Sequence, residues 1–265
     1  DGAKLDDQLN NSLAAIIDGV RFAGNNRGNV GIDVDSTSAC DFELRGVIVT
    51  DMLDRGVRIR NAKDSDYKAL ITACQSSRNA ADGLSGSGAW DYAIHASLFG
   101  ENGQEGIELD ALVPDTGGKA KLEVEGCQFF GNGAEGLDCS MAAPLVATSG
   151  EFSVEIRATA FERNALAGCL IDSDIESAPG YSAKVVVRES TARGNGGNGF
   201  HLDLDGPLDL AEDMTAFVYR VLATGNAANG LYITSESRPG FMAVSTSALV
   251  GNGSAGLRAE GPAAS

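Results

Sequence analysis

Apolar and polar residues alternate in short runs along most of this chain, and the runs recur at a regular interval. The motif Asn-x-x-x-Gly followed by an apolar residue begins at Asn79, Asn102, Asn132, Asn164, Asn195, Asn226 and Asn252. Two looser copies precede these seven, and the nine copies are spaced 23 to 32 residues apart. Eight residues before each of these nine positions stands an aliphatic residue, namely Ile17, Leu44, Ile71, Ile94, Val124, Ile156, Val187, Val218 and Val244.

Each repeat contains three alternating runs separated by tight bends. A period of two points one side of a run inward and the other outward, which is typical of a β-strand. Three short strands per repeat predict an all-β fold, a parallel β-solenoid of about nine coils, because stacked coils bury a core that no single coil can form. A helical fold is not expected, since apolar residues do not recur at helical spacing and the 34 glycines would penalise helices.

This pattern resembles the right-handed parallel β-helix of the pectin-lyase-like superfamily. The resemblance extends from about Leu13 to Glu260, and we expect residues 1–265 to form one single-stranded β-helix domain. It implies a fold and not one activity, since the superfamily includes lyases, hydrolases, epimerases, adhesins and phage tailspikes. It also implies an extracellular or cell-surface location and a polysaccharide groove along the outer face of a long sheet.

The repeat gives a structural explanation for several residues that otherwise suggest chemistry. The Asn column is predicted to form a ladder of side-chain amides between coils, and the Gly that follows takes a backbone position that a Cβ would disfavour. The G-x-G-x-x-G segment at Gly194 is therefore not expected to bind a nucleotide cofactor, because a strand follows it and not a helix. All five cysteines fall on inward positions and are predicted to be buried without disulfides.

Charge and the chain ends narrow the range of partners. The net charge of −17 argues against nucleic acid and anionic membranes, which need a basic surface. No run of 18 apolar residues is present, so membrane insertion is not expected. Helical spacing of Leu5, Leu9 and Leu13 predicts a short cap in residues 1–12, whereas few residues after Glu260 remain to cover the last coil. We therefore expect self-association or flanking domains.

Candidate chemistry lies on the outward positions two and four residues after the repeat Gly, which carry eight carboxylates in eighteen places. At one end, Asp33 and Asp35 face Arg58 and Arg60, which predicts ion pairs. Further along, three carboxylates meet on adjacent coils, enough to hold Ca²⁺ together with waters; they are Glu108, Asp110 and Asp138. A solvated acidic surface is the alternative interpretation of these three residues.

A third outward set runs over four consecutive coils and consists of Asp172, His201, Asp203, Tyr232 and Arg258. His titrates near neutral pH, and Tyr and Arg supply a second acid or base and a charge stabiliser. Abstraction of the proton beside a uronate carboxylate, as in a lyase or C5-epimerase, needs these roles. The polygalacturonase-type Asp-Asp and Gly-His-Gly signatures are absent, however, and no lysine stands on this face. His95, the other histidine, is predicted to be plain surface.

These observations predict a secreted or cell-surface β-helix that binds a polysaccharide, acidic or neutral, along its outer sheet face. Cleavage by a lyase mechanism or epimerisation of that polymer is left open, with Asp172, His201, Asp203, Tyr232 and Arg258 as the catalytic candidates. Ca²⁺ is the candidate cofactor. The alternative is a non-catalytic structural or adhesive rod whose acidic face keeps it in solution.

Overall fold

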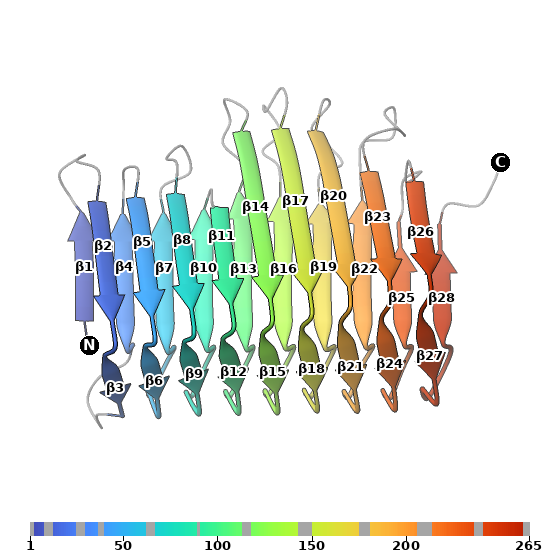
Figure 1. The fold of residues 1–265 in the computed structure, drawn as a ribbon, viewed down its shortest axis with the longest axis horizontal. Helices are drawn as coiled ribbons and strands as arrows, with labels where there is room; N and C mark the ends of the chain where they lie inside the picture. The colour runs from blue at the N-terminus through green and yellow to red at the C-terminus, as the bar shows by residue number, and fades with distance from the viewer. Residues whose placement is uncertain are drawn as a thin grey trace.

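The computed structural model describes eleven segments of the chain, and every strand named below lies within them. The segments are 3–7, 13–24, 30–36, 40–61, 67–88, 91–112, 118–142, 150–174, 181–205, 214–235 and 241–261. Each coil runs through three strands, and each strand pairs in parallel with its equivalents in the neighbouring coils. Figure 1 shows the coils side by side along one axis, from β1–β3 in blue to β26–β28 in red.

The described strands form three parallel sheets of ten, nine and nine strands. Sheet A consists of β1 (Ala3–Asp7), β4 (Ile32–Ser36), β7 (Val57–Asn61), β10 (Leu84–Gly88), β13 (Ile107–Leu112), β16 (Leu137–Ala142), β19 (Cys169–Asp174), β22 (Phe200–Asp205), β25 (Leu231–Thr234) and β28 (Leu257–Glu260). Sheet B consists of β2 (Leu13–Asp18), β5 (Cys40–Arg45), β8 (Tyr67–Thr72), β11 (Asp91–His95), β14 (Gly118–Glu125), β17 (Gly150–Arg157), β20 (Tyr181–Arg188), β23 (Met214–Tyr219) and β26 (Phe241–Ser245). Sheet C consists of β3 (Arg21–Ala23), β6 (Ile48–Thr50), β9 (Gln75–Ser77), β12 (Leu98–Gly100), β15 (Gln128–Phe130), β18 (Ala160–Glu162), β21 (Thr191–Arg193), β24 (Leu222–Thr224) and β27 (Ala248–Val250). The predicted β-solenoid with three short strands per coil is confirmed.

The core is one column of apolar side chains that the three sheets enclose. Burial alternates along the strands, as in β11, where Tyr92 and Ile94 are buried between partly exposed neighbours. On the inner side of sheet C, Phe129 stacks on Phe99 and Phe161, with ring centroids 5.4 and 4.9 Å apart. All five cysteines lie in described segments, are buried and form no disulfide, as predicted.

The Asn column forms the predicted ladder on the inside of the bend between sheets C and A. Each amide nitrogen donates to the amide oxygen of the next coil at 2.9 or 3.0 Å, from Asn79 through Asn102, Asn132, Asn164, Asn195 and Asn226 to Asn252. Backbones approach closely beside this ladder. A Cβ on Gly136 would lie 2.4 Å from the carbonyl oxygen of Gly168, so only glycine fits there.

The N-terminal segment differs from its predicted helical cap. Residues 3–7 form strand β1, which pairs in parallel with β4 of sheet A, and Leu13 begins β2. The physical reason is that β4 would otherwise present an edge of backbone N–H and C=O groups, which a strand can satisfy and a helix cannot. Leu9 lies outside the described residues.

Candidate functional site on the outward face of sheet A

The register of sheet A aligns its outward side chains in columns across the coils. The residue two places after each repeat Gly faces its equivalent in the next coil, as with Glu108 and Asp138 or His201 and Tyr232. The residue four places after the Gly forms a second column, which includes Asp110, Asp172 and Asp203. Groups about thirty residues apart in the chain therefore become nearest neighbours, at the spacing of stacked strands, about 4.8 Å.

The column begins with the predicted ion pairs. Arg58 contacts Asp33 at 2.7 Å, and Arg60 contacts Asp35 at 3.0 Å. The charges of this segment compensate one another, so the predicted ion pairs are confirmed.

The following coils carry a group of carboxylates that we term the acidic row: Asp82, Glu105, Glu108, Glu135 and Asp138. Arg55 contacts Asp82 at 2.8 Å and approaches Glu108 at 3.9 Å. Among the described residues, no Lys or Arg forms an ion pair with the other three members of the row. One carboxylate oxygen from each of Glu105, Glu135 and Asp138 lies within 4.8 Å of the others, close enough for the three to hold one metal ion.

Burial and neighbouring charges make several carboxyl groups of the acidic row harder to ionise. Burial, and then the neighbouring charges of Glu135 and Glu108, raise the pKa of Asp138 to about 7. Burial also raises the pKa of Asp82 to about 6, and Arg55 opposes this increase only partly. The pKa values of Glu108 and Glu135 are raised as well, chiefly by burial. Perturbed carboxyl groups of this kind cluster at functional sites.

Two of the three residues predicted to bind Ca²⁺, Glu108 and Asp138, belong to the acidic row, and the third, Asp110, does not. Asp138 belongs to the group within metal-binding distance, and Glu108 faces it across the register of β13 and β16. Asp110 lies in the second column, four places after the repeat Gly. It is exposed and pairs in register with Ser140. The residues that join Asp138 within metal-binding distance are Glu105 and Glu135, which stand one place before the repeat Gly.

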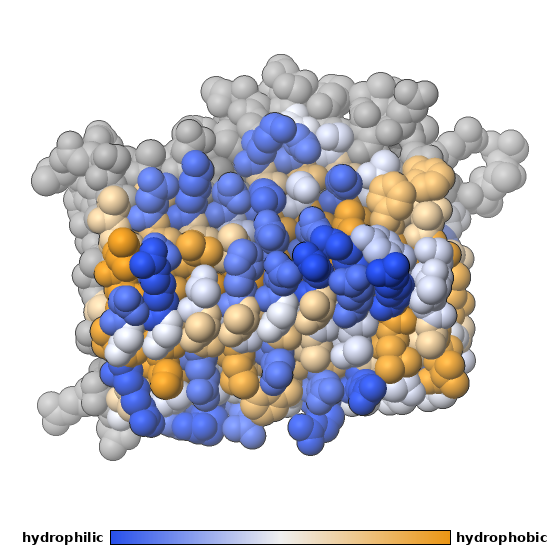
Figure 2. Space-filling model, in the orientation of Figure 1, coloured by the Kyte–Doolittle hydropathy of each residue, from blue (hydrophilic) through white to orange (hydrophobic). Residues whose placement is uncertain are grey.

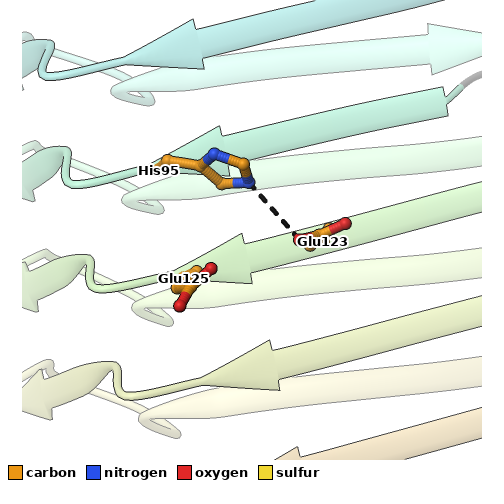
Figure 3. A group of neighbouring side chains, drawn as sticks. All are labelled: His95, Glu123 and Glu125. Atoms are coloured by element: carbon orange, nitrogen blue, oxygen red, sulfur yellow. Dashed lines mark ion pairs between the residues drawn. The ribbon is translucent and has the colours of Figure 1, made fainter.

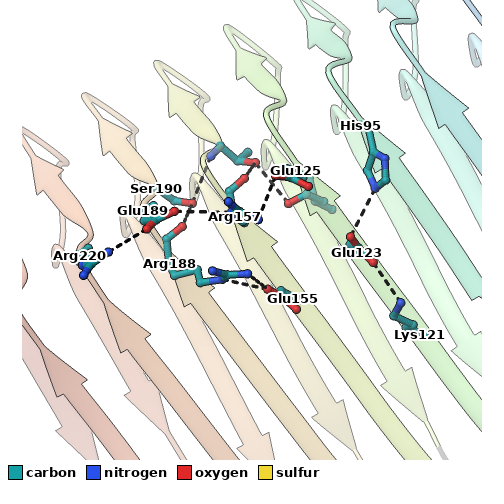
Figure 4. A network of polar contacts seen from close by, with 12 residues as sticks. His95, Lys121, Glu123, Glu125, Glu155, Arg157, Arg188, Glu189, Ser190 and Arg220 are labelled. Atoms are coloured by element: carbon teal, nitrogen blue, oxygen red, sulfur yellow. Dashed lines mark hydrogen bonds and ion pairs between the residues drawn. The ribbon is translucent and has the colours of Figure 1, made fainter.

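On sheet B, in contrast, carboxylates lie close to cationic side chains. His95 lies on this sheet, with its imidazole directed toward Glu123 (Figure 3). In the polar network of Figure 4, cations contact the carboxylates of this region, with Lys121 on Glu123 at 3.0 Å and Arg157 on Glu125 at 3.3 Å. Figure 2 shows hydrophilic side chains gathered across the middle of the rod, with hydrophobic surface toward both ends. Compared with this network, the acidic row is poor in cations.

The predicted catalytic set is assembled further along sheet A. His201 stacks on Tyr232, with ring centroids 4.8 Å apart, and the guanidinium of Arg258 lies 5.4 Å from the centroid of the Tyr232 ring. Asp172 and Asp203 face each other in the second column, and the hydroxyl of Thr234 donates to Asp203 at 2.7 Å. The five predicted residues are therefore neighbours on consecutive coils.

Glu260 forms hydrogen bonds with two of the residues predicted to act in lyase chemistry, Tyr232 and Arg258. The Tyr232 hydroxyl donates to its Oε2 at 2.6 Å, and Nε of Arg258 donates to its Oε1 at 2.8 Å. The hydrogen bond to Glu260 raises the pKa of Tyr232, which disfavours its use as a base. Burial lowers the pKa of His201, so its imidazole is neutral at neutral pH, but its Nε2 is a buried atom without a hydrogen-bond partner.

One comparison with known protein families found a match to this architecture. The family model described as "Right handed beta helix region" matches residues 8–212, more than half of the chain. The chain belongs to the right-handed β-helix family. A search of curated proteins and a search of solved structures found no match to this β-helix. Within the described segments, the β-helix contains no helix of the length and hydrophobicity needed to cross a membrane.

Sequence reasoning missed three members of the acidic row in this β-helix. Asp82, Glu105 and Glu135 stand one place before the repeat Gly, in the bend that leads into sheet A. Only the strand positions after the Gly were treated as outward there. A signal was present, because the same column reads Arg55, Asp82, Glu105 and Glu135 in consecutive coils. Glu260 stands four residues after the repeat Gly, an outward position, but its two hydrogen bonds depend on side-chain positions that a column pattern does not specify.

Replacing Asp138 by asparagine is expected to stabilise the β-helix at pH 8 and to change little at pH 4. The unfolded carboxyl ionises near pH 4 and the folded one near pH 7. The penalty for ionising Asp138 is therefore absent below about pH 4, grows as the pH rises, and is complete above about pH 7. After allowance for solvent screening, we expect a gain of about 1–2 kcal/mol at pH 8.

Thermal unfolding of the wild-type and Asp138→Asn proteins at the two pH values measures this difference. Asp110→Asn is the matched control, since Asp110 is exposed on the adjacent strand. Equal responses of the two variants at pH 8 would show that burial and repulsion at Asp138 are not the cause.

Proposed function

We propose that this β-helix binds an extracellular polysaccharide along the outward face of sheet A, with the acidic row as the centre of the binding surface. The observation that carries the proposal is the contrast between the two faces. The acidic row keeps carboxyl groups, such as that of Asp138, whose pKa burial and neighbouring carboxylates raise, whereas cations contact the carboxylates on sheet B. Retaining such repulsion costs stability, and a ligand or a cation would relieve it.

The chemistry of the acidic row limits the class of polysaccharide. Carboxylates accept hydrogen bonds from sugar hydroxyl groups, and such charge-assisted bonds are stronger than neutral ones. The net charge of −17 repels a polyuronate. A neutral glycan therefore binds directly, and an acidic one binds when Ca²⁺ bridges its carboxylates to Glu105, Glu135 and Asp138. Oxygen ligands in this number suit Ca²⁺, which completes its shell with water and ligand oxygens.

Binding without cleavage is favoured over lyase or epimerase activity. Tyr232 and Arg258 both bond to Glu260, and Nε2 of His201 is buried beneath the surface. A base must come within hydrogen-bond distance of the proton that it removes. Catalysis is the second candidate function, because the imidazole of His201 is neutral.

Binding to a panel of neutral polysaccharides and polyuronates, with Ca²⁺ or with a chelator, tests the proposal. We expect one class of polymer to retard the protein in affinity electrophoresis. The double variant Glu135→Gln, Asp138→Asn should weaken that binding about tenfold or more, because charge-assisted hydrogen bonds are lost. The matched control removes two carboxylates from sheet B, through Glu43→Gln and Glu155→Gln, and should bind like the wild type.

The same panel separates the alternatives. Unsaturated uronate products that disappear in His201→Ala and Tyr232→Phe would establish a lyase. No binding to any polymer would favour the structural or adhesive rod. Equal loss in the acidic-row and control variants would mean that overall charge, and not the acidic row, governs binding.

A further inference from the structure

A second cluster with ligand chemistry lies on sheet B, on a different sheet from the proposed binding surface. His95 ends β11, and Glu123 and Glu125 end β14 in the next coil. The register places His95 directly opposite Glu125 and Ala93 opposite Glu123. Glu123 is therefore the diagonal neighbour of His95, and both glutamates lie within reach of its imidazole (Figure 3).

The atoms that would bind a cation converge between the two strands. Nε2 of His95 lies 3.6 Å from Oε1 of Glu123, and one oxygen of Glu125 completes a group whose members all lie within 4.8 Å of one another. A separation of 3.6 Å is too long for a hydrogen bond. Nε2 of His95 is also a buried atom without a hydrogen-bond partner. A buried polar atom without a partner is costly, and a metal ion at this point would satisfy it.

Neighbouring cations contact both glutamates, and Lys121 does so without occupying the oxygen of Glu123 that faces His95. Lys121 contacts Oε2 of Glu123 at 3.0 Å, which leaves Oε1 directed toward the imidazole. On the other side, Arg157 contacts Oε1 of Glu125 at 3.3 Å and also reaches Glu189 (Figure 4).

We propose that His95, Glu123 and Glu125 bind one divalent transition-metal cation of the Zn²⁺ class. One imidazole nitrogen and two carboxylate oxygens leave the fourth tetrahedral position to water. The three ligand atoms must approach to about 3.3 Å from one another to coordinate Zn²⁺, which small changes in side-chain torsions supply. Ca²⁺ and Mg²⁺ are excluded as preferred ions, because they take oxygen ligands and imidazole suits the transition metals.

The bound ion would join neighbouring coils through β11 and β14. This site is independent of the proposed polysaccharide surface, since none of its ligands lies on sheet A. Its role is to cross-link the solenoid at a point where an imidazole and two carboxylates already meet. Because the ion binds only the folded arrangement, the melting temperature should rise with its concentration.

The composition of the chain allows a direct test. It has two histidines, His95 and His201, so substituting each in turn shows which imidazole binds the metal. We expect the tag-free, chelator-treated protein to bind one equivalent of Zn²⁺ in equilibrium dialysis. Cu²⁺ in the same site should give an electron paramagnetic resonance spectrum with coupling to one imidazole nitrogen. His95→Gln should remove that coupling and weaken Zn²⁺ binding by roughly tenfold to a hundredfold, whereas His201→Gln should change neither.

Two further variants separate a metal site from a surface ion-pair network. Lys121→Met removes a positive charge beside Glu123 and should tighten Zn²⁺ binding, because that charge repels the cation, whereas a purely structural network gives no such gain. Glu105→Gln with Glu135→Gln changes sheet A and should leave Zn²⁺ binding unchanged. The proposal is wrong if the wild type binds no stoichiometric Zn²⁺, or if His95→Gln binds Zn²⁺ as tightly as the wild type does. It is also wrong if the sheet A variants reduce binding as much as His95→Gln does.

Discussion

Replacing Phe161 by alanine should destabilise the protein by about 3–5 kcal/mol, the largest effect that we expect of a single side-chain truncation. Phe161 is fully buried and lies in the middle of the aromatic column. Its ring stacks on Phe129 at 4.9 Å and meets Phe200 edge to face at 5.9 Å. Alanine leaves a cavity between rigid strands, and the coils above and below cannot collapse into it without breaking their register.

Chemical denaturation of wild-type and Phe161→Ala proteins measures the change, and the melting temperature should fall by about 10 °C. Leu166→Ala is the matched control from the same coil, because Leu166 is 51% exposed. That control should change stability by less than about 0.5 kcal/mol. A loss of the same size in both variants would contradict the packing argument.

Replacing Asn164 by alanine should cost about 3 kcal/mol or more, although it removes little apolar area. The Asn164 side-chain oxygen accepts from the backbone and side-chain nitrogens of Asn132 at 3.2 and 2.9 Å. Its side-chain nitrogen donates to Oδ1 of Asn195 at 3.0 Å. Because the ladder is buried, the backbone N–H of Asn132 would be left without a partner, and the amides of Asn132 and Asn195 would each lose one of their hydrogen bonds, at about 1–3 kcal/mol for each group.

Asn198→Ala provides the comparison for this prediction. Asn198 accepts two hydrogen bonds from Asn229, at 3.0 and 2.9 Å, but its side chain is partly exposed. Water can replace it there, so we expect a loss of about 1 kcal/mol. Denaturation curves that rank the two variants in the opposite order would show that burial does not set the cost of breaking an amide ladder.

The inside of this solenoid could be predicted from the sequence. The aliphatic column that includes Ile94 and Val124, the amide ladder and the buried cysteines all follow from a pattern that repeats in every coil. A period of two assigns each strand residue to one side, and the repeat then aligns residues of one kind between coils. The predicted helical cap failed, because spacing of Leu5, Leu9 and Leu13 says nothing about the strand edge that β1 covers.

The outside of the solenoid was only partly predictable. The neighbours Glu108 and Asp138, and the stacked pair His201 and Tyr232, follow from register. The bend positions of Glu105 and Glu135 have no alternation to assign them, so their approach to Asp138 was missed.

Sequence by itself determined which residues share a column in this protein, because backbone pairing between coils repeats with the motif. Only the tertiary structure decided which polar side chains meet across columns. The contact between His95 and Glu123 is diagonal, and the contact of Tyr232 with Glu260 also crosses columns. Such contacts depend on side-chain torsions and burial, and no periodic pattern constrains either of them.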